Sequence, residues 1–206
     1  MEPIIQILII IHAILGTIAL ISGLIAIITR KGSKVHKQGG ICFVYSMFLS
    51  GAVAIFVSVL PGHENPFLFS IGIFSIYFLL IGYRATKFKN PNHKLTFETR
   101  ISQLMFLVCS AMIIMPIINS FSLNIVSTVF GVFASLSNIL QFRNIEDTKK
   151  KWLSIHLGNI TGAYISAVTA FMVVNQLLPG TLNWFAPSVP GAIFIIYWLR
   201  KAAKPA

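Results

Sequence analysis

The chain has 206 residues, of which 56% are hydrophobic and only 10% are charged, and its mean hydropathy is +0.83. A soluble domain usually carries about 25% charged residues, so this composition excludes an ordinary soluble enzyme. The net charge of +11 does not indicate a nucleic-acid partner, because the basic residues form small clusters beside apolar runs, without interleaved aromatic residues. We therefore predict a single integral membrane domain over residues 1–206, of all-α fold class, with the lipid bilayer as its surroundings.

Apolar runs divide the chain into seven predicted transmembrane helices, because crossing the hydrocarbon core takes about 20 residues and the backbone there must satisfy its own polar groups. The spans cover residues 3–29, 41–60, 67–85, 101–118, 123–142, 152–178 and 184–200. Residues 119–122 form a tight hairpin between the fourth and fifth spans. The seventh is short, since only residues 191–199 are apolar after Pro190, which suits a first helical turn. It crosses only if residues 184–189 contribute or if Arg200 snorkels.

The distribution of basic residues predicts how the protein is oriented. All 16 Lys and Arg fall on one side of the seven-span topology. They are Arg30, Lys31, Lys34 and Lys37; Arg84, Lys87, Lys89, Lys94 and Arg100; Arg143, Lys149, Lys150 and Lys151; and Arg200, Lys201 and Lys204. The opposite side carries Glu2 and Glu64. Because cytoplasmic loops retain Lys and Arg, we expect an N-terminus outside and a C-terminus inside a cytoplasmic (inner) membrane.

Small residues at helical spacing favour close packing of helices in lipid. Gly158 and Gly162 stand four residues apart on the sixth span, which is the spacing of a common helix-packing motif. We predict that this face of the sixth span packs tightly against a neighbouring helix.

Histidines are the candidate cofactor-binding residues. His12 lies in the first span, about 13 Å from the outer face at about 1.5 Å per residue. His36 is expected in the inner loop before the second span, and His156 lies about 6 Å from the inner face. An ionisable group inside a membrane is a functional hypothesis by default. The alternative is a neutral imidazole hydrogen-bonded to a neighbouring helix. His63 and His93 are predicted to be solvated loop residues.

Depth decides which histidines could share a ligand. A metal or a haem iron holds nitrogen ligands at about 2 Å, so both rings must reach one point. His36 and His156 lie at similar depths and could do so if the second and sixth spans are neighbours, whereas His12 and His156 could not. A supporting polar layer is predicted at the inner level from Gln103, Asn138, Asn159 and Arg100. No carboxylate lies within a predicted span, which argues against a proton pump.

Two stretches carry a family resemblance. One contains His12-x3-Gly16 and Arg30-x5-His36-Lys37-x2-Gly40, and the other runs from His156 to Asn175. They resemble the motifs HxxxG, RxGxxHRxxG and HxxRMxGxYIAxxTAFxVxN of a family of bacterial predicted multi-pass membrane proteins that has no assigned function. There are departures: Lys37 replaces an Arg, and residues 159–160 read Asn-Ile in place of Arg-Met. The resemblance strengthens His12, His36 and His156 as site residues but implies no chemistry.

Alternatives from different functional classes stay open at this stage. The first is a non-catalytic protein that acts in membrane assembly or binds a partner, either a second copy or another membrane protein. The second is a redox protein that holds haem b or a transition metal between His36 and His156, with His12 near an outer site. Weaker alternatives are a small-solute transporter and a zinc-dependent membrane hydrolase. The hydrolase needs three histidines and an acid around one metal, and only two histidines share a depth.

Overall fold

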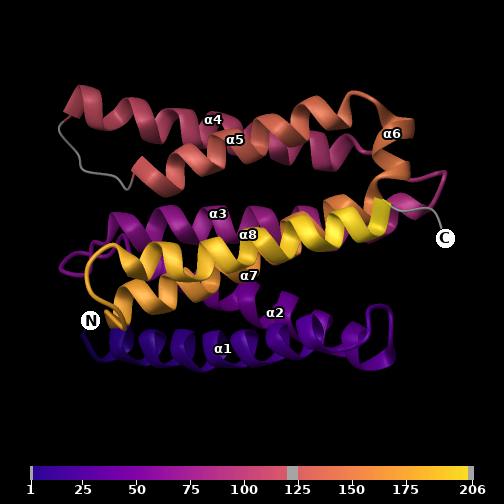
Figure 1. The fold of residues 1–206 in the computed structure, drawn as a ribbon. Helices are drawn as coiled ribbons and strands as arrows, with labels where there is room; N and C mark the ends of the chain where they lie inside the picture. The colour runs from indigo at the N-terminus through magenta and orange to yellow at the C-terminus, as the bar shows by residue number, and fades with distance from the viewer. Residues whose placement is uncertain (1, 120–124, 204–206) are drawn as a thin grey trace. The chain divides into compact units, whose positions relative to one another are not determined.

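The computed structural model describes residues 2–119 and 125–203, and the regular elements among them are all helical (Figure 1). The predicted all-α class is therefore confirmed. In chain order the elements are α1 (Glu2–Ile28), α2 (Lys34–Val57), α3 (Pro66–Arg84), the 3-10 helix η1 (Ala85–Lys89), α4 (Thr96–Asn119), α5 (Ile125–Phe142), α6 (Ile145–Lys150), α7 (Trp152–Asn175) and α8 (Leu182–Ala203). Residues 120–122 of the predicted hairpin lie outside the described residues.

Six of these helices are long and apolar enough to cross a membrane, namely α1, α2, α3, α4, α7 and α8. The chain therefore has the helices of a multi-pass membrane protein. In α5 the apolar segment identified among the described residues, Gly131–Phe142, is shorter than a full span. The count of seven spans stays a prediction.

Helices α2, α4 and α8 begin earlier than the apolar pattern predicts, and α4 begins at Thr96 rather than at residue 101. Helix α2 begins at Lys34 rather than at residue 41, because the Ser33 side chain caps its first turn and accepts a hydrogen bond from the backbone nitrogen of His36 at 3.1 Å. His36 therefore lies in a helix and not in a loop. Helix α8 begins at Leu182, so Pro190 stands inside it rather than in its first turn.

The turn before α8 is built by one buried side chain. Asn183 is only 1% exposed, and its amide oxygen accepts a hydrogen bond from the backbone nitrogen of Leu178 at 2.8 Å. Its amide nitrogen donates to the carbonyl of Leu178 at 2.5 Å. This side chain thereby fixes where the last helix starts, which an apolar pattern does not show.

The distribution of side chains is the reverse of that in a water-soluble protein. Isoleucines on α1 are widely exposed, for example Ile4 at 64% and Ile28 at 71%. Exposed apolar surface of this extent is rare on soluble monomers and costs nothing against lipid chains. Small hydroxyl side chains lie inside instead, and several donate to the carbonyl four residues earlier in their own helix. These are Ser22, Ser46, Ser135 and Thr169.

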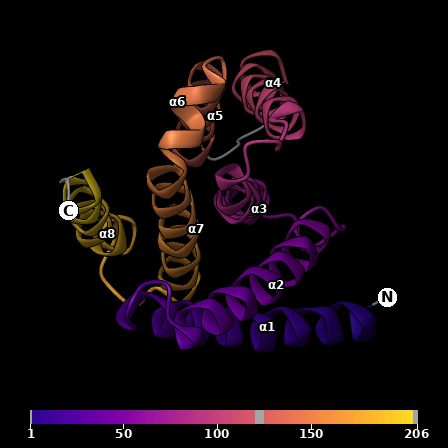
Figure 2. The same ribbon diagram turned by 90° about the vertical axis from the view of Figure 1, so that its right-hand side faces the viewer.

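The chain divides into two compact units, which are described separately. One comprises residues 1–76 and 164–188, and the other comprises residues 77–163 and 189–206. In the first unit α1 packs along α2 (Figure 2). In the second, α4 packs along α5, and the short helix α6 contacts both α5 and η1.

Tyr164 anchors α7 within the first unit. Its hydroxyl donates to the carbonyl of Leu20 on α1 at 3.1 Å, and its ring meets that of Phe43 on α2 edge to face at 5.8 Å. A β-carbon at Gly23 would stand 2.6 Å from the Tyr164 ring, so only glycine leaves room for it. One aromatic side chain thus joins three helices.

Candidate functional site

His12 links α1 to α2 through a reciprocal pair of hydrogen bonds with Ser50. The Nδ1 atom of His12 lies 3.0 Å from the Ser50 carbonyl and 2.9 Å from its hydroxyl, and this hydroxyl donates back to the His12 carbonyl at 3.1 Å. A carbonyl only accepts, so Nδ1 carries the proton and donates it. The ring therefore acts as a connection between two helices.

His36 connects the same two helices at their other end. Its Nδ1 donates to the Ala26 carbonyl, in the last turn of α1, at 2.8 Å. The ammonium of Lys31 donates to the carbonyls of Ala26 and Ile27. A helix end leaves such carbonyls without partners in the helix, so these two side chains complete the C-terminus of α1. Burial lowers the pKa of Lys31 from its usual value.

His156 makes the corresponding bond in the second unit. Its Nδ1 donates to the Gly82 carbonyl on α3 at 2.8 Å. The two backbones run close together here, because a β-carbon at Gly82 would lie 2.6 Å from the backbone nitrogen of Ile160. All three candidate histidines thus donate from Nδ1 to a carbonyl of a neighbouring helix.

A buried polar layer joins four helices of the second unit. The amide nitrogen of Asn138 on α5 donates to the Tyr77 hydroxyl on α3 at 2.8 Å and to the Asn159 amide oxygen on α7 at 3.4 Å. The hydroxyls of Tyr77 and of Ser102 on α4 lie 2.9 Å apart. The structure thus brings together Asn138 and Asn159, two members of the predicted polar layer. Tyr77 and Ser102 were missed, because a tyrosine or serine in an apolar run gives no sign of its partner.

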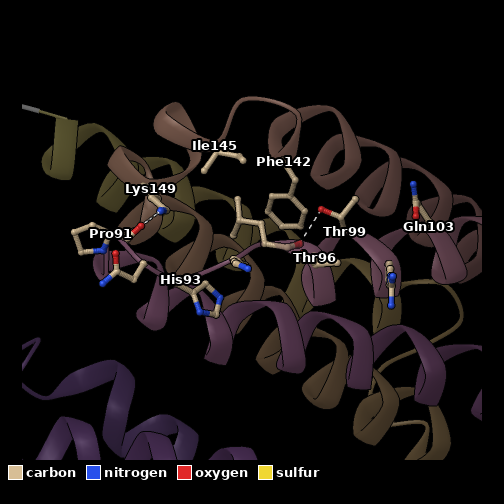
Figure 3. Close-up of a pocket in the computed structure, with 12 residues that line it drawn as sticks. Pro91, His93, Thr96, Thr99, Gln103, Phe142, Ile145 and Lys149 are labelled. Atoms are coloured by element: carbon tan, nitrogen blue, oxygen red, sulfur yellow. Dashed lines mark hydrogen bonds between the residues drawn. The ribbon is translucent and has the colours of Figure 1, made fainter.

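The other two members of that layer, Arg100 and Gln103, are exposed and line an open cavity of about 790 Å³ (Figure 3). The cavity lies where α4 begins, beside the end of α5 and α6. His93, Lys94 and Lys149 also line it. Its lining holds no Asp or Glu among the described residues, so the cavity is positive.

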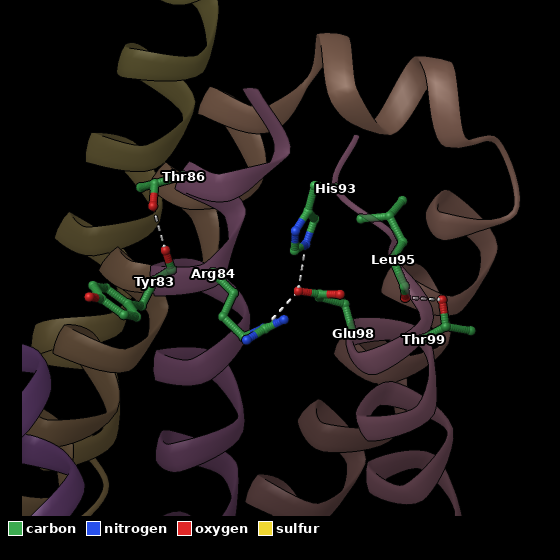
Figure 4. A network of polar contacts seen from close by, with 7 residues as sticks. All are labelled: Tyr83, Arg84, Thr86, His93, Leu95, Glu98 and Thr99. Carbon is green, nitrogen blue, oxygen red and sulfur yellow. Dashed lines mark hydrogen bonds and ion pairs between the residues drawn. The ribbon is translucent and has the colours of Figure 1, made fainter. Parts of the chain in front are cut away.

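Behind this cavity lies a carboxylate that water does not reach (Figure 4). Glu98 is 0% exposed, and its Oε1 atom accepts hydrogen bonds from Nε of Arg84 at 2.6 Å and from Nε2 of His93 at 3.1 Å. Its Oε2 atom has no hydrogen-bond partner among the described residues. The Arg84 guanidinium also stacks over the Phe97 ring at 4.2 Å.

Two sequence expectations are wrong here. His93 is not a solvated loop residue, because only 16% of its side chain is exposed and its ring stacks on Phe88 at 5.6 Å. Glu98 is not outside the apolar helices, because α4 begins at Thr96 and so includes it. Hydropathy places a helix boundary at the edge of its apolar run, whereas α4 begins before that edge and carries the buried Glu98 in its first turn.

No group of three or more His, Cys, Asp or Glu side chains that could hold a metal ion occurs within residues 2–119 and 125–203. His36 belongs to the first unit and His156 to the second, so their use as a pair of metal or haem ligands stays a prediction. His12 likewise stays a predicted cofactor-binding residue.

Comparison with known proteins adds no assignment: no family model, no curated protein and no solved structure matches the chain. The resemblance to bacterial predicted membrane proteins stays a prediction. The chain is a helical protein with six candidate membrane spans, and its candidate site is a set of polar contacts between its helices.

Proposed function

We propose that the protein is a non-catalytic integral protein of a bacterial cytoplasmic membrane, which acts in assembly or binds a membrane partner. The observation that carries this proposal is the shared use of Nδ1 by His12, His36 and His156. Each ring donates its Nδ1 proton to a backbone carbonyl of the neighbouring helix. This is the bond by which a polar side chain joins two helices in lipid.

The buried polar layer supports the same role. Asn138 bonds to both Tyr77 and Asn159, and the Asn159 amide nitrogen donates to the Ile155 carbonyl at 2.9 Å. In a medium of low polarity, such a network makes one arrangement of its helices the favoured one. These side chains therefore serve to hold helices together.

The proposed topology has seven spans, with the N-terminus outside and the C-terminus inside. It is supported by the placement of all 16 Lys and Arg on one side. Helix α8 adds support, since it has 22 residues and carries Arg200 and Lys201 in its last turn. That length exceeds the roughly 20 residues that a crossing takes.

A second candidate function, haem or metal binding by His36 and His156, is favoured by one observation. Donation from Nδ1 of His36 to a carbonyl leaves Nε2 of a neutral ring as the nitrogen with a lone pair. Histidine ligands of metals are usually oriented by such a hydrogen bond from the ring nitrogen that does not bind the metal. This hydrogen bond therefore agrees with both the non-catalytic function and the metal-binding function, and an experiment must decide between them.

The deciding experiment uses the full chain purified in mild detergent. We expect a colourless sample without stoichiometric metal, seen by visible spectra of the oxidised and dithionite-reduced protein and by elemental analysis. His12→Ala should lower the thermal stability by about 0.6–2 kcal/mol, the range for hydrogen bonds between membrane helices. The matched control is His63→Ala, because that side chain lies in a loop and its ion pair with Glu2, at 3.4 Å, is largely open to solvent on the Glu2 side and should contribute little.

Retention of haem or of a metal by the purified protein would support the second candidate function. A Soret band that shifts on reduction and disappears in His156→Ala would overturn the non-catalytic proposal in favour of a cytochrome. Retained metal that is lost in both His36→Ala and His156→Ala would favour a metal site. For assembly, cross-linking in membranes should give one discrete product, either a homo-oligomer or a complex of fixed ratio.

A further inference from the structure

We propose that the cavity at the start of α4 binds the headgroup of an anionic phospholipid. The first step is its charge. His93, Lys94, Arg100 and Lys149 line it and no carboxylate does. Neither Lys94 nor Arg100 has an acidic partner among the described residues, so both cations are available to an anion.

The second step is the separation of Glu98 from the cavity. This carboxylate is fully buried and bonds to Arg84 and to His93. It therefore holds the His93 ring from behind, while the ring itself borders the cavity. The negative charge of Glu98 is balanced in the interior and does not compete for Lys94 or Arg100.

The third step is the apolar part of the lining, which distinguishes a lipid from a free anion. Leu95, Phe142 and Ile145 line the cavity beside the cations. Ile145 is 52% exposed and can contact an acyl chain, whereas Leu95 and Phe142 are each 4% exposed and form the floor of the cavity. A ligand with a phosphate next to a glycerol backbone and acyl chains matches this mixed lining better than inorganic phosphate does.

The fourth step is position. The cavity lies where α4 begins at Thr96 and where α5 ends at Phe142, which is where lipid headgroups meet the ends of apolar helices. Basic cavities between helices on the cytoplasmic side are known headgroup sites. The inference rests on the membrane insertion proposed above and goes beyond the proposed function.

The test measures lipid retention by the full chain in a neutral detergent. Dioleoyl phosphatidylglycerol is titrated and bound lipid is counted by native mass spectrometry, with dioleoyl phosphatidylcholine and inorganic phosphate as parallel arms. In the double variant Lys94→Gln/Arg100→Gln we expect the dissociation constant for phosphatidylglycerol to rise roughly 30-fold, the factor expected on losing two basic contacts. The matched control Lys34→Gln/Lys37→Gln removes the same charge from α2 and should change it less than about 3-fold.

A second pair of variants tests whether binding needs the space of the cavity, without changing its charge. Thr96→Trp and Ile145→Trp fill the space and keep every cation, so each should also weaken phosphatidylglycerol binding. Both positions are exposed, and a thermal scan identifies a variant that fails to fold. Two fillings at different positions keep the test decisive if one of them does.

Several outcomes would overturn the inference. Equal weakening in both charge variants, with no effect of either tryptophan, would show diffuse attraction only. Equal retention of phosphatidylcholine would show no headgroup preference. Inorganic phosphate that binds as tightly as phosphatidylglycerol would make this a small-anion site. Failure of membrane insertion itself would be seen separately, as protein that stays in solution without detergent.

Discussion

Glu98 brings a carboxylate into a position that water does not reach, held by one arginine and one histidine. Its Oε1 atom accepts both hydrogen bonds, and Oε2 has none among the described residues. A buried ion pair gains little over an apolar pair of similar volume, but removing one partner leaves an uncompensated charge. Removing Arg84 alone is therefore expected to destabilise the protein more than removing Arg84 and Glu98 together.

A double-mutant cycle tests this expectation. Arg84→Met alone should lower the free energy of unfolding by about 3–5 kcal/mol, because Glu98 stays buried with His93 as its sole partner. The double variant Arg84→Met/Glu98→Met should be more stable than that single variant. Denaturation in mixed micelles measures these two variants and Glu98→Met, which completes the cycle.

The control cycle uses an exposed ion pair of the same unit. Lys151 and Asp147 lie 3.2 Å apart, with 58% and 52% of their side chains exposed, and their coupling should stay below about 1 kcal/mol. Equal couplings for the two pairs would contradict a special role for the buried one.

The polar residues of the second unit show which buried contacts can be predicted from the sequence and which cannot. Asn138 and Asn159 were expected at one level, because their positions along their spans place them at a similar depth, and they do meet. His93 was not found, since its surroundings of Pro, Asn and Lys look solvated. Its burial arises from Phe88 and Glu98, and contacts made by the fold leave no local pattern in the chain.

At the scale of helices, the structure does not place tight packing at the two glycines where the sequence predicts it. The Gly158 and Gly162 spacing favours tight packing on α7, yet a β-carbon at Gly158 would meet nothing within 4 Å and one at Gly162 would make an ordinary contact at 3.6 Å. A tight contact with the backbone of α7 is made instead by Gly82 of α3 against Ile160. A spacing motif identifies small residues, but the partner helix decides which of them is needed.

Substitution of these glycines gives a matched pair. Gly82→Ala should destabilise the protein by about 1–3 kcal/mol, because the added methyl group meets backbone that cannot move aside. Gly158→Ala should be neutral or stabilising by up to about 1 kcal/mol, because alanine favours a helix more than glycine does. Thermal midpoints in one detergent would compare them, and equal losses would contradict the close approach at Gly82.

The first residues of the helices also could not be predicted from hydropathy. The apolar run of α2 begins well after the helix does, because its first turn is polar and is held by the Ser33 cap. The type of every long helix was predictable from its apolar content, whereas the ends depend on single hydrogen bonds. His36 lies in such an end, and its place in the structure therefore could not be read from hydropathy.

At the scale of the whole molecule, charge makes the orientation testable. In a background with Cys42→Ser and Cys109→Ala, Glu64→Cys should react with a membrane-impermeant maleimide on intact bacterial spheroplasts. Lys87→Cys should react only after permeabilisation, because Lys and Arg stay on the cytoplasmic side. Both positions are exposed.

The reverse labelling pattern would contradict the proposed orientation. Labelling of both positions on intact spheroplasts would show that α3, which lies between them, does not cross the membrane.

The hydroxyl groups of Ser22, Ser46, Ser135 and Thr169 bond within their own helices. Such a bond depends on one helix alone, so it survives when that helix shifts along its neighbour. The pair of His12 and Ser50 does not survive, since sliding α1 by one turn of about 5.4 Å would break it. Resistance to sliding therefore depends on a few side chains that bond between helices. Weakening one of them should let one helix shift along its neighbour while each helix stays folded.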